Sequence, residues 1–110
     1  MGRKELKVLV LNIAMDLDRV GRFAMENKED RRKQFLELVN KQVKELENVD
    51  LPITFLNTYE YLRENLKQLN MDAVDASYID NAFTTASMLT NRGVRAIDII
   101  TMMKDYQARE

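Results

Sequence analysis

The sequence predicts an all-α protein: a compact bundle of four to five mostly antiparallel helices with short connections, in a single helical domain over residues 1–110. Apolar residues recur at the three- and four-residue spacings of a helix through most of the chain. Three glycines and one proline are too few for a sandwich or barrel, which needs a turn about every 8–12 residues. The chain is 45% apolar and 32% charged, which supplies both a core and a solvated surface.

The first helix is expected near residues 6–24. Its apolar stripe has offsets close to 3.6 residues and consists of Leu6, Val10, Ile13, Leu17, Val20 and Ala24. The run Val8–Leu11 is also compatible with a short strand. A lone strand would leave its backbone groups unpaired, so the helix is favoured.

The next two helices have clearer stripes. The segment 26–48 carries one apolar face, formed by Phe35, Leu36, Val39, Val43 and Leu46. Asp50-Leu51-Pro52 predicts a new helix start, because proline suits the first helical turn. The stripe that follows is heptad-like and consists of Phe55, Tyr59, Leu62, Leu66 and Leu69. Tyr61 lies off this stripe and is expected to point away from the core.

The segment 73–91 differs from the others because it is rich in alanine and has no lysine or arginine. Its apolar residues lie on more than one face, which is typical of a central helix or of one that meets a partner. Asp72 is its expected N-cap. Asn91-Arg92-Gly93 predicts its end, because glycine suits the left-handed position after a helix. A fifth helix is then expected over residues 94–106.

The composition excludes several classes of site. The chain has no cysteine and no histidine, which excludes disulfides and thiolate metal sites and removes the usual base at neutral pH. A net charge of −1 argues against a surface that follows nucleic acid. No cofactor is expected. No run reaches the roughly 18 apolar residues of a membrane span, and no secretory signal is recognisable, so the default location is cytoplasmic.

Two sets of carboxylates suggest metal-dependent chemistry. Asp16-Leu17-Asp18 follows an apolar run and resembles the nucleophile and acid of haloacid-dehalogenase-type phosphatases. That family needs a parallel sheet, for which this chain lacks the strands, so both aspartates are expected on the solvent side of the first helix. Glu60 and Glu64 form only an i, i+4 pair. A small magnesium-dependent all-α hydrolase is therefore the third hypothesis for function.

The favoured hypothesis is a small non-enzymatic protein–protein interaction or regulatory module. Methionines adapt to varied surfaces, small residues permit close approach, and tyrosines anchor interfaces. These properties define a candidate interface for a protein partner or a homodimer at Ala76, Tyr78, Ala82, Met88, Met102, Met103 and Tyr106.

The alternative hypothesis is a nucleic-acid-binding regulator. Its candidate contacts with phosphate, or with an acidic partner, are Arg31, Arg32, Lys33, Arg92 and Arg95. A helix-turn-helix around Gly93 would present Arg95 and Asp98 to a DNA groove. Because Asp98 would face phosphate there, an αα-hairpin is the preferred interpretation of this stretch.

Overall fold

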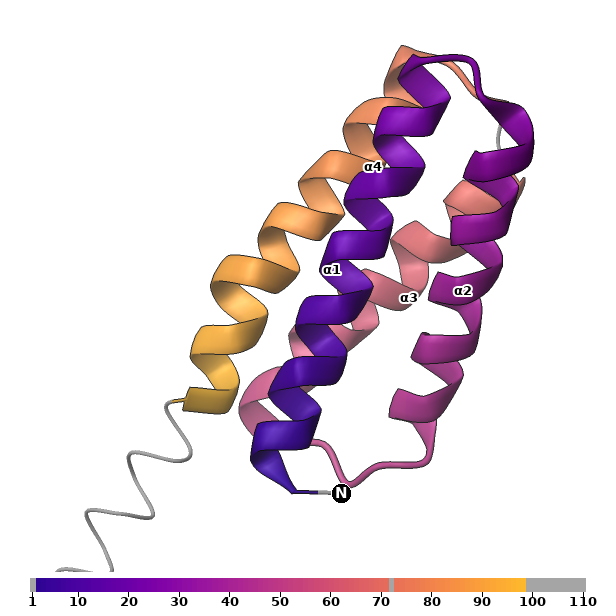
Figure 1. Cartoon of the computed structure of the whole chain (residues 1–110). Helices are drawn as coiled ribbons and strands as arrows, with labels where there is room; N and C mark the ends of the chain where they lie inside the picture. Colours follow the sequence, from indigo (N-terminus) through magenta and orange to yellow (C-terminus); the bar gives the residue numbers. More distant parts are fainter. Residues whose placement is uncertain (1, 72, 99–110) are drawn as a thin grey trace, which may run out of the picture.

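The computed structural model of the protein describes residues 2–71 and 73–98, which form a bundle of four α-helices (Figure 1). The helices are α1 (Arg3–Met25), α2 (Glu29–Glu47), α3 (Leu56–Met71) and α4 (Ala76–Met88). No strand occurs among these residues. The predicted all-α bundle is confirmed, with four helices rather than five, and the first segment is a helix.

Neighbouring helices run antiparallel. Figure 1 shows α1 and α4 side by side, and Gly21 of α1 lies against Phe83 of α4. At the other end of α1, Lys7 forms an ion pair with Asp98, beyond α4. The α1–α2 turn is tight because Asn27 adopts the left-handed conformation, with φ 58°, which asparagine tolerates better than most residues. α3 completes the bundle beside α2 and α4.

The apolar stripes predicted for the first three helices form the core. Every member of the α1 stripe is buried, as is every member of the stripe that leads into α3. In α2 the buried members are Leu36, Val39, Val43 and Leu46, and Phe35 packs at the edge of the core. Phe55 is fully buried and lies in a 3₁₀ turn, Ile53–Phe55, immediately before α3.

The start of α4 is set by Asp75 rather than by the expected Asp72. The Asp75 carboxylate accepts a hydrogen bond from the backbone N–H of Tyr78 at 2.9 Å, which satisfies one of the free donors of the first turn. Asp72 lies outside the described residues.

The prediction that the helix ends at Asn91-Arg92-Gly93 is wrong. The helix passes through a π-helical turn, Leu89–Gly93, and resumes as α-helix over residues 94–98. Gly93 is not left-handed; a Cβ there would lie 3.3 Å from Phe55, so the glycine permits close packing. Neither a helix-turn-helix nor an αα-hairpin therefore forms within residues 82–98. Residues 99–106 of the expected fifth helix lie outside the described residues.

The expectation that Asp16 lies on the solvent side of α1 is also wrong. Asp16 is buried between α1 and α2, with 4% of its surface exposed. One carboxylate oxygen accepts a hydrogen bond from Arg19 at 2.6 Å, and the other accepts one from the Gln42 amide at 3.1 Å. These partners offset the cost of removing a carboxylate from water. The aspartate therefore joins two helices.

Close packing of α1 on α4 predicts a steric effect at Gly21, where a Cβ would lie 2.8 Å from the Phe83 ring. Gly21→Val is expected to lower the free energy of unfolding by about 1–2 kcal/mol, because overpacking exceeds the gain in helix propensity. Urea unfolding measures the loss. Adding Phe83→Ala should reverse part of it through positive coupling between the two sites; strictly additive losses would contradict the contact.

Candidate functional site

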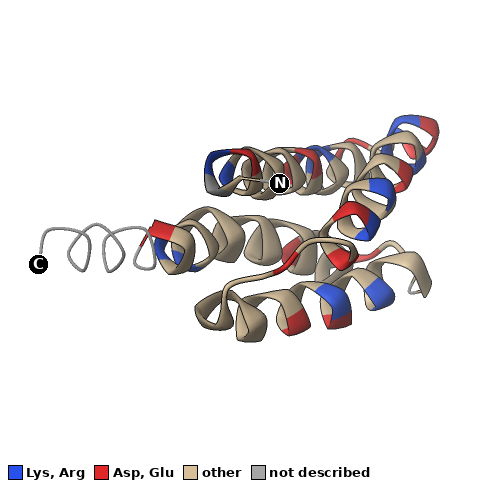
Figure 2. Cartoon of the chain, turned by 90° about the horizontal axis from the view of Figure 1, so that it is seen from below, with Lys and Arg blue, Asp and Glu red and all other residues tan. Residues whose placement is uncertain are grey.

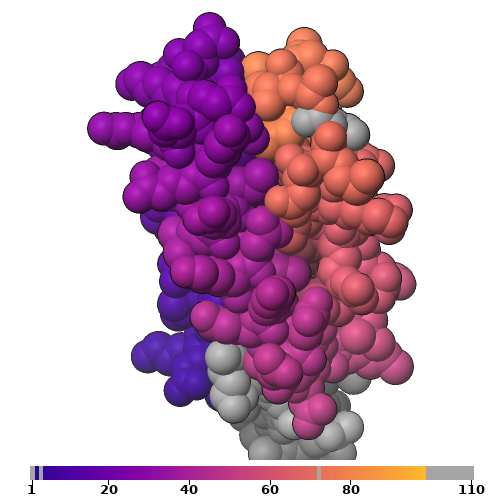
Figure 3. Space-filling view, turned by 90° about the vertical axis from the view of Figure 1, so that its right-hand side faces the viewer, coloured from indigo at the N-terminus to yellow at the C-terminus, as the bar shows by residue number. Residues whose placement is uncertain are grey.

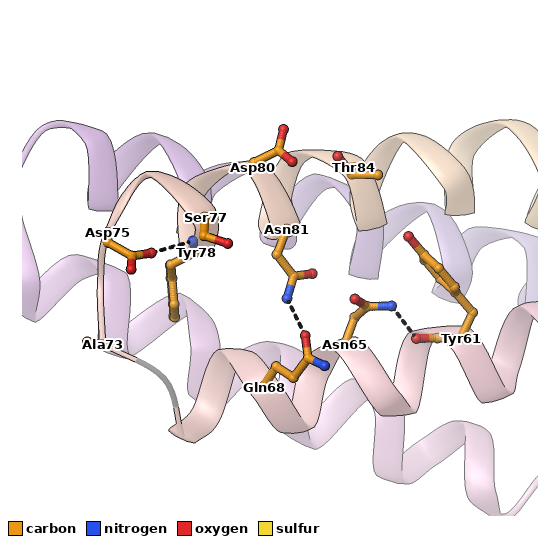
Figure 4. Close-up of a pocket in the computed structure, with 10 residues that line it drawn as sticks. All are labelled: Tyr61, Asn65, Gln68, Ala73, Asp75, Ser77, Tyr78, Asp80, Asn81 and Thr84. Atoms are coloured by element: carbon orange, nitrogen blue, oxygen red, sulfur yellow. Dashed lines mark hydrogen bonds between the residues drawn. The ribbon is translucent and has the colours of Figure 1, made fainter.

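A hollow lined by several kinds of polar side chain lies between α3 and α4 (Figure 4). We call it the α3/α4 groove. Its volume is about 410 Å³, within the range of ligand-binding clefts. Its lining consists of Tyr61, Asn65, Gln68, Ala73, Asp75, Ser77, Tyr78, Asp80, Asn81 and Thr84.

Side-chain amides from both helices meet inside this groove. Asn81 of α4 and Gln68 of α3 point toward each other, and the Asn81 amide donates to the Gln68 oxygen at 3.4 Å (Figure 4). Asn65 donates to the backbone oxygen of Tyr61 at 2.8 Å. Amides donate and accept at once, so this surface can match the hydrogen-bonding groups of another chain.

Tyr78 forms a fixed wall of the groove. It is buried, and its hydroxyl oxygen accepts a hydrogen bond from Arg32 of α2 at 2.9 Å. Burial raises the pKa of Tyr78, and the hydrogen bond and charge of Arg32 only partly oppose this. Burial also acts to lower the pKa of Arg32, but its hydrogen bonds to Glu29 and Tyr78 outweigh that effect, so the pKa is raised. Tyr78 is therefore neutral and Arg32 charged near neutral pH.

The charged side chains that line the groove, among the described residues, are all acidic. Asp75 and Asp80 are the charged residues of its lining, and no lysine or arginine contributes to it. Along α4 the one charged residue is Asp80, and Figure 2 shows most of this ribbon without charge while its neighbours alternate between both signs. The electrostatic field in the groove therefore favours a cationic group.

The residues of the sequence-predicted interface do not share one surface. Ala76 is exposed at the start of α4, Met88 is half-buried, and Ala82 is fully buried in the core. Tyr78 is buried but lines the α3/α4 groove. Met102, Met103 and Tyr106 lie outside the described residues.

The predicted phosphate contacts fall at opposite ends of the bundle. Arg31 and Lys33 are exposed near the start of α2, whereas Arg32 is buried and bonded to Tyr78. Arg92 lies fourteen residues after Tyr78 along the same helix, which is about 20 Å at 1.5 Å per residue. Arg92 and Arg95 are exposed there. One phosphate group therefore cannot contact both sets.

Several cations near the α1–α2 turn already lie over aromatic rings. Phe23 and Phe35 stack with ring centroids 5.5 Å apart. The Arg19 guanidinium lies over the Phe35 ring. The Lys28 ammonium and the Arg31 guanidinium lie over the Phe23 ring, at 6.0 and 5.7 Å from its centre. Such cation–π contacts stabilise the turn. Residue spacing along one helix does not reveal this cluster, because its members are spread over α1, the turn and α2.

The sequence pattern also did not reveal the amides of the groove. Asn65, Gln68 and Asn81 lie off the apolar stripes, where polar residues normally face solvent. The one signal in the sequence was Tyr61, which is exposed, as its position off the stripe predicted, and lines the groove.

Two kinds of feature, a metal-binding cluster and a membrane-spanning helix, are missing from the described residues. Among them, no group of three or more acidic side chains could hold a metal ion. No helix in residues 2–71 and 73–98 is long and apolar enough to cross a membrane.

Comparison of the chain with protein-family models, with curated proteins and with solved structures finds no match.

Proposed function

We propose that the protein is a non-enzymatic interaction module whose α3/α4 groove binds a partner polypeptide that carries a lysine or arginine. The observation that carries the proposal is the lining of this groove, which combines amides, hydroxyls and two carboxylates without a cation. The carboxylates attract a positive side chain, and the amides provide hydrogen bonds for the adjoining main chain.

The hydroxyl groups support binding rather than nucleophilic catalysis. Ser77 and Thr84 line the groove, but neither makes a hydrogen bond to a base among the residues described. A serine or threonine nucleophile needs an adjacent base to take its proton. The groove thus offers recognition chemistry without an activated nucleophile.

Tyr61 and Tyr78 give the groove one adaptable side and one rigid side. Tyr61 is exposed and extends from α3 toward α4 (Figure 4), a position from which its ring can cover a bound segment. Tyr78 is held by Arg32. Tyrosine is enriched at protein interfaces because it combines apolar area with a polar tip.

The proposal is tested with a labelled dodecapeptide that alternates lysine and serine, compared with a matched peptide in which glutamine replaces lysine. Only the lysine peptide is expected to bind and to shift the NMR side-chain amide signals of Asn65, Gln68 and Asn81. Asp80→Asn should weaken binding about threefold, since exposed ion pairs contribute about 0.2–1 kcal/mol.

The matched control is Glu37→Gln, which removes the same charge from an exposed position on α2. It should leave the affinity for the lysine peptide unchanged. Equal weakening by Asp80→Asn and Glu37→Gln would show that binding follows net charge alone and would contradict a site in the groove. Unchanged NMR signals of the groove amides on addition of the lysine peptide would also contradict a site in the groove.

A further inference from the structure

A second hollow, of opposite charge, lies between α2 and α3. We call it the α2/α3 hollow; it has a volume of about 350 Å³. Figure 3 shows this face, with α2 and α3 side by side. The lining consists of Asn40, Val43, Lys44, Glu47, Arg63, Leu66, Lys67 and Asn70.

The three cations of this hollow form no ion pair with a carboxylate in the described part of the chain. Lys44, Arg63 and Lys67 are exposed and make no ion pair within 4.0 Å among the described residues. This differs from Arg22, Lys28 and Arg32, each of which is paired with a neighbouring acid. Glu47 is the one carboxylate in the lining, so the hollow carries a local excess of positive charge.

A contact between the two helices closes one end of the hollow, and an aromatic ring positions a cation at the other end. Asn40 and Asn70 exchange two hydrogen bonds, each 2.9 Å long, and so join α2 to α3 at one end. At the other end the Arg63 guanidinium lies 5.7 Å from the centre of the Tyr59 ring, which holds it over α3. Val43 and Leu66 are buried side chains of the lining and give it an apolar base.

We propose that the α2/α3 hollow binds an acidic polypeptide segment, with its glutamates or aspartates on Lys44, Arg63 and Lys67 and an apolar side chain over Val43 and Leu66. Charge complementarity selects the occupant. A peptide is favoured over nucleic acid because the buried Val43 and Leu66 form an apolar base in the lining, which suits an apolar side chain that a peptide carries and a sugar–phosphate backbone does not.

This site shares no residue with the α3/α4 groove. Either proposal can therefore fail while the other stands, because different amide signals and different variants report on each. Together the two sites would place α3 between a cation-binding and an anion-binding surface.

The test uses a labelled dodecapeptide of glutamates with a central leucine, a matched glutamine peptide, and a twelve-nucleotide single strand. We expect the glutamate peptide to bind most tightly and to shift the side-chain amide signals of Asn40 and Asn70. Its affinity should fall as salt is added. Lys44→Glu combined with Lys67→Glu should weaken binding at least about tenfold. Lys44→Gln with Lys67→Gln should give a smaller loss.

Lys33→Glu is the control, because Lys33 is an exposed lysine of α2 outside the hollow and makes no ion pair within 4.0 Å among the described residues. Its effect on affinity should stay below about twofold. The proposal is overturned if Lys33→Glu weakens binding as much as the paired variants, if the oligonucleotide binds as tightly as the peptide, or if the glutamate peptide fails to bind. Circular dichroism confirms that each variant is folded.

Discussion

Replacing Phe55 with alanine is expected to lower the free energy of unfolding by about 3–5 kcal/mol, the usual cost of deleting a buried aromatic ring. The ring is completely buried in the turn before α3. It also packs close to the π-helical turn, since a Cβ at Gly93 would lie 3.3 Å from the ring. The cavity would therefore open where α3 and the end of α4 meet, and neither helix could close it without losing other contacts.

Urea unfolding followed by circular dichroism measures this loss. Ile53→Ala provides the control, because Ile53 lies in the same turn but is 79% exposed. Its effect should stay within about 0.5 kcal/mol. If both variants lost the same stability, the turn would not be packed as described.

Tyr78→Phe is expected to cost about 2–3 kcal/mol, because the phenylalanine ring fills the same space but removes a hydrogen bond to a charged group. Arg32 then loses the acceptor for its Nη1 atom. Its Nε atom is already buried without a partner among the described residues. Among the described residues the guanidinium would keep Glu29 as its hydrogen-bond partner, through the Nη2 atom, and the aromatic ring at position 78, which lies 5.4 Å away.

The same variant should change the alkaline pH dependence. Burial raises the pKa of Tyr78 above its usual value of 10.0, so the folded state holds this proton more tightly than the unfolded chain. The resulting contribution is fully present below pH 10 and is lost as the pH rises through the raised pKa. Tyr78→Phe should therefore flatten the fall in stability above pH 10.

Tyr61→Phe is the control for loss of a tyrosine hydroxyl, because Tyr61 is exposed, and it should leave the stability at neutral pH unchanged. A separate acid-side effect is expected to persist in Tyr78→Phe. The hydrogen bond from Arg32 lowers the pKa of Glu29 below 4.5, so this contribution is present above pH 4.5 and is lost as the pH falls through the lowered pKa. Loss of that acid transition would contradict the assignment.

The helices and their core faces follow from the sequence because burial of an amphipathic stripe depends on local spacing. Leu17, Val39 and Leu62 illustrate this, since each is fully buried at the position that its stripe predicts. Asp16 was misplaced because its burial depends on Gln42, twenty-six residues away in the sequence. Spacing within one helix contains no information about such a partner.

The two candidate sites could not be predicted from the sequence, because their residues also come from different helices. The α3/α4 groove brings Gln68 to Asn81, and the α2/α3 hollow brings Asn40 to Asn70. Each pair joins polar residues that are ordinary on a single exposed helix face. Their significance depends on which helices become neighbours, and this is decided by packing of the whole bundle.

The π-helical turn also bears on how this sequence should be aligned with others. Buried positions of α4 step from Tyr78 to Ala82, Thr85 and Leu89, and an uninterrupted alternation of four and three would next bring Arg92 inward. The wider turn places Gly93 there instead and leaves Arg92 in solvent. Between Leu89 and Gly93 the chain thus has one residue more than a regular α-helix with the same buried positions. An alignment of apolar positions with such a helix must therefore open a one-residue gap in the other sequence at this point.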